Sequence, residues 1–439
     1  MPSINEQGYK RVLFIGLGAK NTLTEERLRE VFAAAGKELA ELKASSVAIW
    51  TTPFTNDRLV CEDVVFTAAE GLGLGAYEFE GYKTNSNDRD VALETVSFIS
   101  SANEEELKAA FEVGKVHAHA VNEARDLVNM PPNILTATEM ASYAQRLAEK
   151  HNFEIEVLGK KEMEELGMGA ILAVNKGSVE DTYKPAFVEL VYKGDESKPL
   201  VALVGKGVTF DTGGISLKSG KDLSDMRMDM GGAAAVSGAL KLLAKTKAQV
   251  NVVVLIPMVE NMPDSTSVLP GEVIHYKNGL TVQVGNTDAE GRLILADALI
   301  RAGEWNAEYI VNIATLTGAV VNALGTELGG VFGDAKLSAE MKEIGDKNGD
   351  FIWPMPLVEA YDSSLDSDYA DMNNISSLSE AGSITAGLFL RRFVPKGSKW
   401  LHVDMAGVMD KSKASGYYAK SATGYGARLL ADFTTHVSK

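Results

Sequence analysis

Four acidic residues stand in short polar stretches between apolar segments. Asp211 follows the run LVALVG within a glycine-rich stretch, and Asp229 precedes GGAAAV. Asp288 and Glu290 stand in NTDAEGRL, directly after TVQV. Four carboxylates balance the charge of two divalent cations, and their hard oxygen atoms suit Mg, Mn or Zn. Two such ions held side by side activate water and stabilise an anionic transition state, so these residues together predict a two-metal hydrolytic site.

Each of these carboxylates also has a purely structural interpretation. Asp211 could bond its own backbone in a turn. Asp288 and Glu290 lie two residues apart ahead of a predicted helix, whose N-terminal dipole they would favour. Asp229 could serve the next helix in the same way, although a carboxylate buried between methionines needs a compensating cation or donor. The metal prediction therefore depends on the four residues together.

Cationic side chains lie beside the acidic ones. Lys206 directly follows LVALVG, and a nearby dication would lower the pKa of its amine enough to make it a neutral metal ligand. Lys218 and Arg292 remain as positive groups available to an oxyanion. Histidine, the commonest metal ligand, adds no second site here: His117 and His119 are two residues apart on a predicted helix, which places them on different faces.

Two other short motifs carry competing predictions. The Asp-Thr-Gly at 211–213 resembles the catalytic turn of an aspartic protease, but that mechanism needs two such carboxylates and the chain has no second Asp-Thr-Gly or Asp-Ser-Gly. Gly16 and Gly18 resemble a dinucleotide-binding loop, yet Asn21 stands at the position of the third glycine. Both motifs are incomplete, so the two-metal site is the favoured prediction.

Strand-like and helical patterns alternate in the first part of the chain. RVLFIG from Arg11 and SSVAIW up to Trp50 are predicted as strands, with a helix over 24–42 between them. A long helix over 104–129 ends at NMPPN, because prolines cannot continue a helix. A helix over 136–151 and the strand-like FEIEVL follow.

Continuously apolar runs fill the chain from about residue 167. Such runs are typical of strands covered by helices on both faces, and the helices are predicted near 232–245 and 292–304. The runs are AILAVN, AFVELVY, LVALVG, VNVVVLIPMV, YIVNIATLTG and WLHVDMAG. Ligands in open α/β sheets collect at the carboxyl ends of strands, where the unusual polar residues fall, so this part is predicted to be catalytic.

Composition limits the class of protein. A chain of 439 residues is expected to form two domains. Its formal net charge of −17 repels phosphate backbones, so nucleic acid is not an expected partner. The single Cys61 excludes an intramolecular disulfide and fits a reducing compartment. The N-terminus lacks a signal-peptide pattern and no long uncharged apolar stretch occurs, so a cytoplasmic location without a membrane is expected.

The motifs resemble those of the leucyl aminopeptidase family (cytosol aminopeptidases), which are dinuclear metallopeptidases. The main matches are VGKGVTFDTGGISLK at 204–218, DMGGAAAV at 229–236 and NTDAEGRL at 286–293. ATLTGA at 314–319, ADMNN at 370–374 and HVDMAG at 402–407 support them. The resemblance covers most of the chain from about residue 165, together with the ARDLVNMPPN linker, and NTDAEGRL is its most specific element.

The resemblance implies a ligand set, carried over by motif position. Asp211, Asp288 and Glu290 would hold one metal. The second metal would be held by Lys206, Asp211, Asp229 and Glu290, so that Asp211 and Glu290 bridge. The free amine of a peptide substrate would bind one metal and its scissile carbonyl the other, which makes the enzyme an exopeptidase. The implied cofactors are two divalent ions per subunit, Mn or Zn, with Mg or Co as alternatives.

The resemblance also implies the remaining roles in catalysis and substrate binding. Lys218 would stabilise the gem-diolate, and Arg292 would hold a bicarbonate ion that acts as general base. The substrate-binding residues would be Met226, Asn286, Thr315, Leu316, Gly318, Ala406 and Met409. The two thioethers favour leucine or methionine side chains, although core packing would also explain them. Ser219 stands after Lys218 where family members often have proline, which leaves the geometry of this loop and the fine specificity open.

Fold and assembly follow from the patterns and the resemblance together. The expected fold class is α/β, with a smaller N-terminal α/β domain at 1–130, a linker helix region at 131–164 and a catalytic domain at 165–439. A mixed central sheet covered by helices is expected in the catalytic domain. The family suggests a homohexamer. The alternative function is a catalytically silent regulatory or binding protein on the same fold, although every implied ligand and both cationic groups are present.

Overall fold

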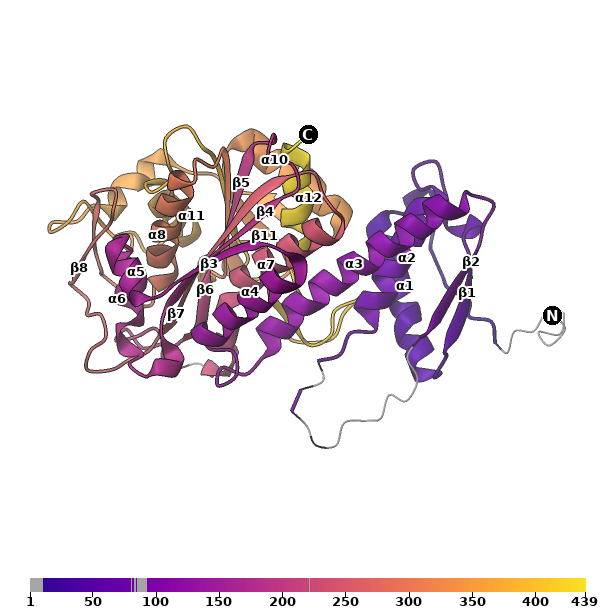
Figure 1. Cartoon of the computed structure of the whole chain (residues 1–439), viewed down its shortest axis with the longest axis horizontal. Coiled ribbons are helices and arrows are strands. Elements are labelled where there is room, and N and C mark those ends of the chain that lie inside the picture. The colour runs from indigo at the N-terminus through magenta and orange to yellow at the C-terminus, as the bar shows by residue number, and fades with distance from the viewer. Residues whose placement is uncertain (1–10, 80, 83, 85–92, 221) are drawn as a thin grey trace. The chain divides into compact units, whose positions relative to one another are not determined.

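The computed structural model of the chain describes residues 11–79, 81–82, 84, 93–220 and 222–439 (Figure 1). The chain forms two units. The first consists of Met1–His119 with Lys413–Lys420, and the second of Ala120–Ser412 with Ser421–Lys439. The chain passes from the first to the second within helix α3 (Glu104–Asn129), which has the bounds predicted from the sequence.

In the described part of the first unit, two helices cover one face of a two-stranded parallel sheet. The helices are α1 (Glu25–Glu41) and α2 (Cys61–Gly75), and the strands are β1 (Ser46–Trp50) and β2 (Thr95–Ile99). Thr24 is the N-cap residue of α1, because its side chain accepts a hydrogen bond from the Arg27 N–H. The predictions of this helix and of SSVAIW as a strand are confirmed.

The prediction of RVLFIG as a strand is wrong. Residues 11–16 have no regular structure, and Phe14 is 81% exposed. A strand must pair its backbone N–H and C=O groups with a neighbour. Within the described residues β1 and β2 pair only with each other, so the apolar run has no strand partner.

Within the described residues, a mixed sheet of nine strands forms the centre of the second unit. Its order is β12-β11-β14-β10-β5-β7-β4-β3, and β6 also pairs with β7. The strands are β3 (Glu154–Leu158), β4 (Ala186–Lys193), β5 (Leu200–Gly205), β6 (Gly207–Asp211), β7 (Asn251–Asn261), β10 (Tyr309–Ala314), β11 (Gly329–Gly333), β12 (Ile352–Pro354) and β14 (Lys399–Asp404). Strands β14, β10, β5 and β7 are parallel, whereas β11 and β4 join them antiparallel. The predicted α/β class with a mixed central sheet is confirmed.

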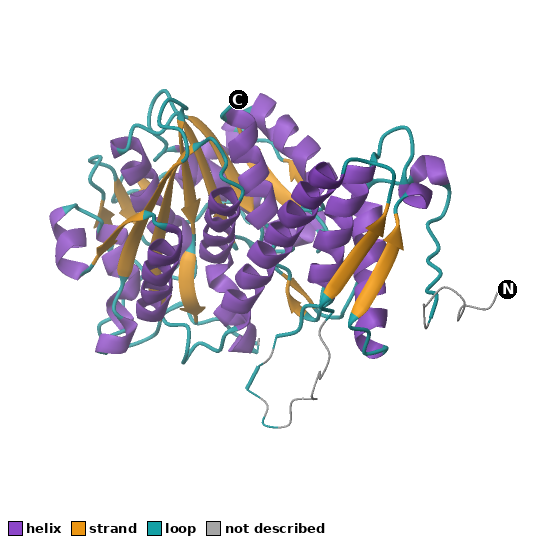
Figure 2. Cartoon of the chain, turned by 45° about the vertical axis from the view of Figure 1, so that its right-hand side comes forward, coloured by secondary structure: helices purple, strands orange, loops and turns teal. Residues whose placement is uncertain are grey.

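Helices cover the sheet on both sides (Figure 2). One contacting group consists of α4 (Ala137–His151), α7 (Gly231–Lys245), α10 (Ala335–Asn348) and α12 (Ala427–Val437). The other group consists of α6 (Gly169–Val174), α8 (Glu290–Glu304) and α11 (Gly382–Arg391). Both α7 and α8 pack on β5, β7 and β10, which explains why most residues of these strands are apolar.

Shorter elements complete the second unit. They are α5 (Lys160–Glu165), α9 (Gly318–Leu324), a small sheet of β8 (Val273–His275), β9 (Thr281–Gln283) and β13 (Met372–Asn373), and the pair β15 (Asp410–Lys411) and β16 (Ser421–Ala422). Strands β8 and β9 precede α8 in the sequence, and β13, from a later part of the chain, pairs with β9.

The prediction of AILAVN as a strand is also wrong, because this run forms helix α6. The carboxylate of Asp297 accepts hydrogen bonds of 3.0 Å from the N–H groups of Ala170 and Ile171, at the start of α6. The periodicity of a short apolar run does not distinguish a buried helix from a buried strand. The other five apolar runs contain strands, and those in YIVNIATLTG and WLHVDMAG end at Ala314 and Asp404, where polar residues or glycines begin.

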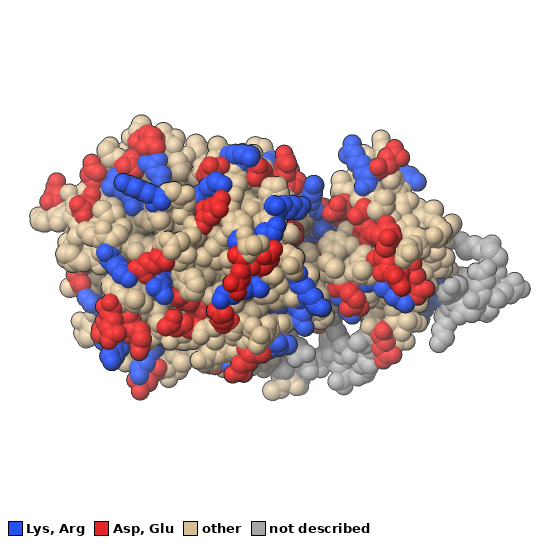
Figure 3. All heavy atoms as spheres, turned by 45° about the horizontal axis from the view of Figure 1, so that its top comes forward, with Lys and Arg blue, Asp and Glu red and all other residues tan. Residues whose placement is uncertain are grey.

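Charged side chains of both signs are interspersed over the face drawn in Figure 3. Among the described residues, no helix combines the length and apolar character that crossing a bilayer requires.

Candidate metal centre

Neighbouring strand ends position Lys206 and Asp211. Lys206 lies between β5 and β6, where its N–H donates to the Ile313 carbonyl and its own carbonyl accepts from the Ala233 N–H. Asp211 is the last residue of β6. Asp211 was predicted within a glycine-rich stretch between apolar segments, and the structure corrects this, because β6 continues through Asp211 before the loop begins. A strand end holds a side chain more firmly than a loop does.

The other two acidic segments are helical or turn-like. Asp229 lies in the 3-10 helix η6 (Leu223–Met230), just before α7, and not at a strand end. Asp288 lies in a turn in which its N–H donates to Asn286 Oδ1 at 2.7 Å. Glu290 is the first residue of α8, so the helix begins two residues before the predicted start at 292. The prediction that both Asp288 and Glu290 precede the helix is thus wrong, because the helix begins at Glu290, directly after the turn.

The structure nevertheless brings these side chains together. Among the described residues, one group of three or more His, Cys, Asp or Glu side chains has ligand atoms that all lie within 4.8 Å of one another, and it consists of Asp211, Asp288 and Glu290. Asp229 is connected to this group through Lys206, whose Nζ lies 2.8 Å from Asp229 and 2.9 Å from Glu290. A compact set of oxygen donors of this kind suits hard divalent cations.

Two ammonium groups stand among the four carboxylates. Besides Lys206, the Nζ of Lys218 lies 2.7 Å from Asp211 and also contacts Asp288. Burial disfavours both ammonium groups, but the adjacent carboxylates outweigh it and raise the pKa of each lysine above its ordinary value. Burial in turn raises the pKa of Asp229, Asp288 and Glu290.

The residues fit divalent cations. Two lysines leave part of the charge of four carboxylates uncompensated. The buried oxygens Asp229 Oδ2 and Glu290 Oε2 accept no hydrogen bond from any described residue, although the Lys206 ammonium lies close to the first. Buried charged oxygens without donors are costly unless a cation compensates them. The donor set, the charge and the two oxygens that accept no hydrogen bond therefore all fit metal binding.

Glycines let these groups approach closely. Gly213 has a φ of +90°, and a Cβ atom there would lie 2.9 Å from Asp288 Oδ1 and 2.6 Å from the Ser216 carbonyl. A Cβ atom on Gly291 would lie 2.7 Å from both Cε and Nζ of Lys206. Any larger residue at either position would push a charged group out of the cluster.

Sequence reasoning missed the residues that join the two acidic loops. Asn261, at the end of β7, donates from Nδ2 to Asp211 Oδ1 at 2.9 Å and to the Thr287 carbonyl at 3.0 Å. The Thr287 hydroxyl donates to the Gly213 carbonyl at 2.6 Å and accepts from the Ser216 N–H at 2.8 Å. A polar residue that ends a long apolar strand was the available signal for Asn261.

Of the predicted substrate-binding residues, Thr315 contacts the cluster directly. The Thr315 hydroxyl donates to Asp229 Oδ1 at 2.7 Å, and its carbonyl accepts from Lys206 Nζ at 3.0 Å. The N–H groups of Leu316 and Ala406 both donate to one carboxylate, that of Asp404, at 3.2 and 3.3 Å.

Asp404 was also missed, although it ends strand β14. It is fully buried and accepts from the Thr317 hydroxyl at 2.6 Å in addition to backbone N–H groups. Burial raises the pKa of Asp404 to about 6, and these donors oppose the rise. The residue joins the loops that follow β10 and β14.

The other predicted substrate-binding residues are Asn286, Met226, Met409 and Gly318. Asn286 uses its side chain to hold the Asp288 N–H. Met226 lies on η6 and Met409 follows β14, and both are half-buried. Gly318 begins α9 and is exposed. No hydrogen bond or ion pair connects Met226, Gly318 or Met409 to the four carboxylates, all of which lie in the described part of the chain.

Arg292 lies in the first turn of α8 and is buried. Its Nη1 donates to the Asn374 carbonyl at 2.9 Å. Burial lowers the pKa of Arg292 to about 10, while the charges of Glu290 and Asp404 act in the opposite direction. The guanidinium therefore remains charged at neutral pH beside the acidic cluster.

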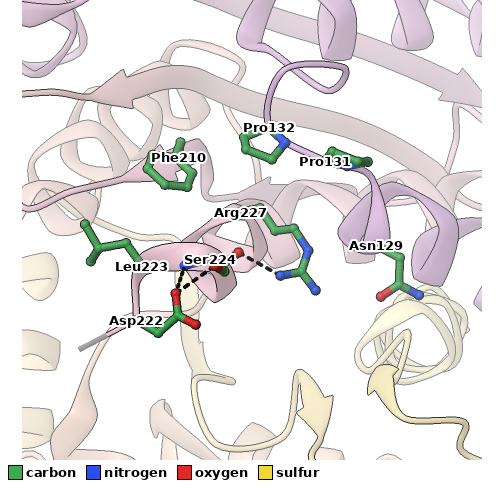
Figure 4. Close-up of a pocket in the computed structure, with 8 residues that line it drawn as sticks. All are labelled: Asn129, Pro131, Pro132, Phe210, Asp222, Leu223, Ser224 and Arg227. Carbon is green, nitrogen blue, oxygen red and sulfur yellow. Dashed lines mark hydrogen bonds between the residues drawn. The ribbon is translucent and has the colours of Figure 1, made fainter. Parts of the chain in front are cut away.

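A cavity of about 560 Å³ is lined by residues of β6, η6 and the end of α3 (Figure 4). Its walls consist of Asn129, Pro131, Pro132, Phe210, Asp222, Leu223, Ser224 and Arg227. Arg227 donates to the Ser224 carbonyl at 2.7 Å and to Asp225 at 2.8 Å. None of the predicted site residues lines this cavity.

The fold and the buried oxygen donors define a metal-binding α/β protein. Residues 122–431 match the model of the cytosol aminopeptidase family, catalytic domain, and residues 1–86 match that of the N-terminal domain of the same family. The chain belongs to the cytosol aminopeptidase family, and the predicted resemblance is confirmed. It is thereby a member of a family of metal-dependent aminopeptidases that act on peptides.

Two solved structures of the bottromycin maturation enzyme BotP are similar to this chain. One of them is a complex with Mn. Each is 32% identical to this chain and covers 97% of it and 90% of the BotP chain, with TM-scores of 0.89 and 0.88.

Proposed function

We propose that this protein is a two-metal aminopeptidase that removes leucine or another apolar residue from the N-terminus of short peptides. The observation that carries the proposal is the group of the buried Asp211, Asp229 and Glu290 with the half-buried Asp288, in which two oxygens accept no hydrogen bond from the described residues. Such an arrangement is costly for the apoprotein and suits cations.

We propose two overlapping ligand sets. Asp211, Asp288 and Glu290 hold one ion, in keeping with their mutual distances below 4.8 Å. Asp229 and Lys206 hold the other together with Asp211 and Glu290, in keeping with the position of Lys206 between Asp229 and Glu290. Lys206 must lose its proton to act as a ligand, and a dication beside it favours that loss. Mn and Zn are the proposed ions, with Mg or Co as alternatives.

Bound divalent ions would polarise the scissile carbonyl and activate water. Lys218 is proposed to contact the substrate and not to bind an ion. Its side chain is 16% exposed, so the ammonium can reach a substrate while it lies beside Asp211 and Asp288. Once cations neutralise these carboxylates, Lys218 Nζ can donate to the oxygen that gains negative charge during hydrolysis.

Arg292 is proposed to hold a bicarbonate ion as general base. Its buried guanidinium has one N–H directed to the Asn374 carbonyl, which fixes its orientation in the first turn of α8. A buried guanidinium favours a small oxyanion because it supplies both charge and paired donors.

The proposed substrate pocket combines the loops after β10 and β14 with η6. Its residues are Met226, Asn286, Thr315, Leu316, Gly318, Ala406 and Met409. Thr315 contacts Asp229 directly, which supports a pocket beside the ions. The half-buried Met226 and Met409 would adapt to leucine or methionine side chains. The homohexamer and the cytoplasmic location stay predictions.

Hydrolysis of leucine p-nitroanilide tests the proposal. We expect activity that a chelator abolishes and that Mn or Zn restores, with no hydrolysis of the N-acetylated substrate. Activity on N-acetylated peptides but not on free N-termini would contradict the proposal. If the chain binds two ions but hydrolyses no peptide of a dipeptide panel, the alternative of a catalytically silent binding protein is favoured instead.

A further inference from the structure

Asn374 follows strand β13 and is completely buried. Its Oδ1 accepts hydrogen bonds from the N–H groups of Gly285 and Asn286, at 2.8 and 3.2 Å. Its Nδ2 donates to the carbonyls of Asn286 and Ala289, at 2.7 and 3.2 Å. An asparagine amide offers two N–H donors and one oxygen with two lone pairs, so this side chain uses its whole hydrogen-bonding capacity on one backbone turn.

The turn that Asn374 holds connects β9 to α8. Asp288 lies within it, and Glu290 follows it as the first residue of the helix. The backbone of Asn374 is itself fixed, because its N–H donates to the Gln283 carbonyl at 3.0 Å. Its own carbonyl accepts from Arg292 Nη1 at 2.9 Å. One residue therefore bonds both the acidic turn and the arginine one turn further along.

The same turn is held from its other side by different groups. Asn261 donates to the Thr287 carbonyl, and the Ser216 hydroxyl accepts from the Thr287 N–H at 3.1 Å. Those contacts fix the middle of the turn against the loop after β6. Asn374 fixes its beginning and its end, at 285–286 and at 289, and thus sets the direction in which Asp288 and the start of α8 point.

We propose that Asn374 is the positioning residue of the metal centre, a role that deepens and rests on the proposed function. It holds Asp288, Glu290 and Arg292 in the arrangement that binds cations and an anion. Only an amide serves here. Aspartate would turn a charged oxygen toward two carbonyl oxygens and add a further negative charge beside the carboxylates. Residues that orient metal ligands through hydrogen bonds typically contribute about 10–100-fold to metal affinity or activity.

The test compares Asn374→Asp with wild type in the full-length chain. We expect the affinity for Mn²⁺, measured by isothermal titration calorimetry on metal-free protein, to fall about 10–100-fold. We further expect kcat for leucine p-nitroanilide to fall more than KM changes, and high Mn²⁺ to restore part of the rate. An Mn²⁺ affinity and kcat/KM within about twofold of wild type would overturn the proposal.

Asn175→Asp is the matched control. Asn175 is also buried, and its amide joins two backbone groups by donating to the Tyr183 carbonyl at 3.0 Å and accepting from the Glu260 N–H at 2.9 Å. The same change there loses a donor and adds a buried charge without touching a proposed ligand. We expect a lower unfolding temperature with unchanged Mn²⁺ affinity. An equal loss of affinity in the control would assign the effect to general destabilisation and overturn the proposal.

A second variant tests the proposal if Asn374→Asp fails to fold. Asn374→Ser adds no charge and leaves room for water to bridge the turn, and it is measured in the same way if Asn374→Asp does not fold. If neither variant folds, the residue is purely structural and the proposal is wrong. Failure of the proposed function itself is distinguishable, because wild type would then hydrolyse no peptide, whether or not it binds Mn²⁺.

Discussion

The second unit contains two kinds of buried carboxylate. Asp404 is surrounded by the donors of Leu316, Thr317 and Ala406, and no cation forms an ion pair with it among the described residues. Asp229 and Glu290 instead pair with one lysine, and each keeps an oxygen that accepts no hydrogen bond from the described residues. A carboxylate whose oxygens accept hydrogen bonds from fixed donors has a structural role. A carboxylate oxygen that accepts no hydrogen bond is available to a cation.

The largest effect is expected at Asp288, which lies in the same cluster as Asp229 and Glu290 but is less buried than they are. Asp288→Ala removes a proposed ligand whose side chain is 32% exposed, so the fold should persist while the chain loses metal and kcat/KM falls about a thousandfold or more. Circular dichroism and metal analysis of the purified variant check both parts. Retention of two ions per chain would refute the ligand assignment.

A smaller and different effect is expected at the first kind. Asp404→Asn keeps the shape of the side chain but directs an NH₂ group at a donor, which should lower the free energy of unfolding by about 1–3 kcal/mol. Because the loops after β10 and β14 loosen, KM should rise while the metal content stays at two ions. Chemical denaturation and steady-state kinetics measure these effects. Loss of metal in this variant would show that the two kinds of buried carboxylate do not differ in function.

The smallest effect on activity is expected at Asp297, which also belongs to the first kind. Burial raises the pKa of Asp297 to about 8, against the opposing N–H groups of Ile171 and Ala170. Between the unfolded pKa near 4 and the folded one, the folded state keeps a proton that the unfolded state has lost. Stability contributed by this group is therefore lost as the pH rises through that window, by at most about 1.4 kcal/mol per pH unit.

Asp297→Asn keeps an acceptor for both N–H groups and cannot titrate. We expect this variant to show a flatter dependence of unfolding free energy on pH than wild type between pH 5 and 8. Denaturant titrations at several pH values measure the slope. Identical slopes in the two proteins would show that Asp297 does not carry this pH dependence.

Much of the fold was predictable because its signals are local. Thr24 and Thr136 cap α1 and α4 through their own side chains, and NMPPN ends α3 where a proline must. The predictions failed where the structure of a segment depends on residues that are distant in the sequence. α6 is fixed by Asp297, which lies more than a hundred residues away, and RVLFIG has no strand partner among the described residues.

The candidate site shows the same division. The charged residues of the cluster could be named from the sequence because their motifs are specific and their charges balance two cations. Asn374 and Asp404 stand in the quoted motifs ADMNN and HVDMAG and Asn261 in none, but the roles of all three could not be predicted. Those roles depend on which backbone groups the side chains reach in the folded chain. The start of α8 at Glu290 was also missed, because the turn held by Asn374 lets the helix begin earlier than its apolar pattern indicates.

Metal content measured together with activity tests the central claim most directly. Full-length protein is dialysed against increasing chelator, and its bound Mn and Zn are counted by mass spectrometry alongside the rate on leucine p-nitroanilide. We predict two ions per chain in the active protein and a rate that falls as they are removed and returns with Mn or Zn. Full activity in protein that holds no metal, or no more than one ion per chain, would contradict the two-metal site.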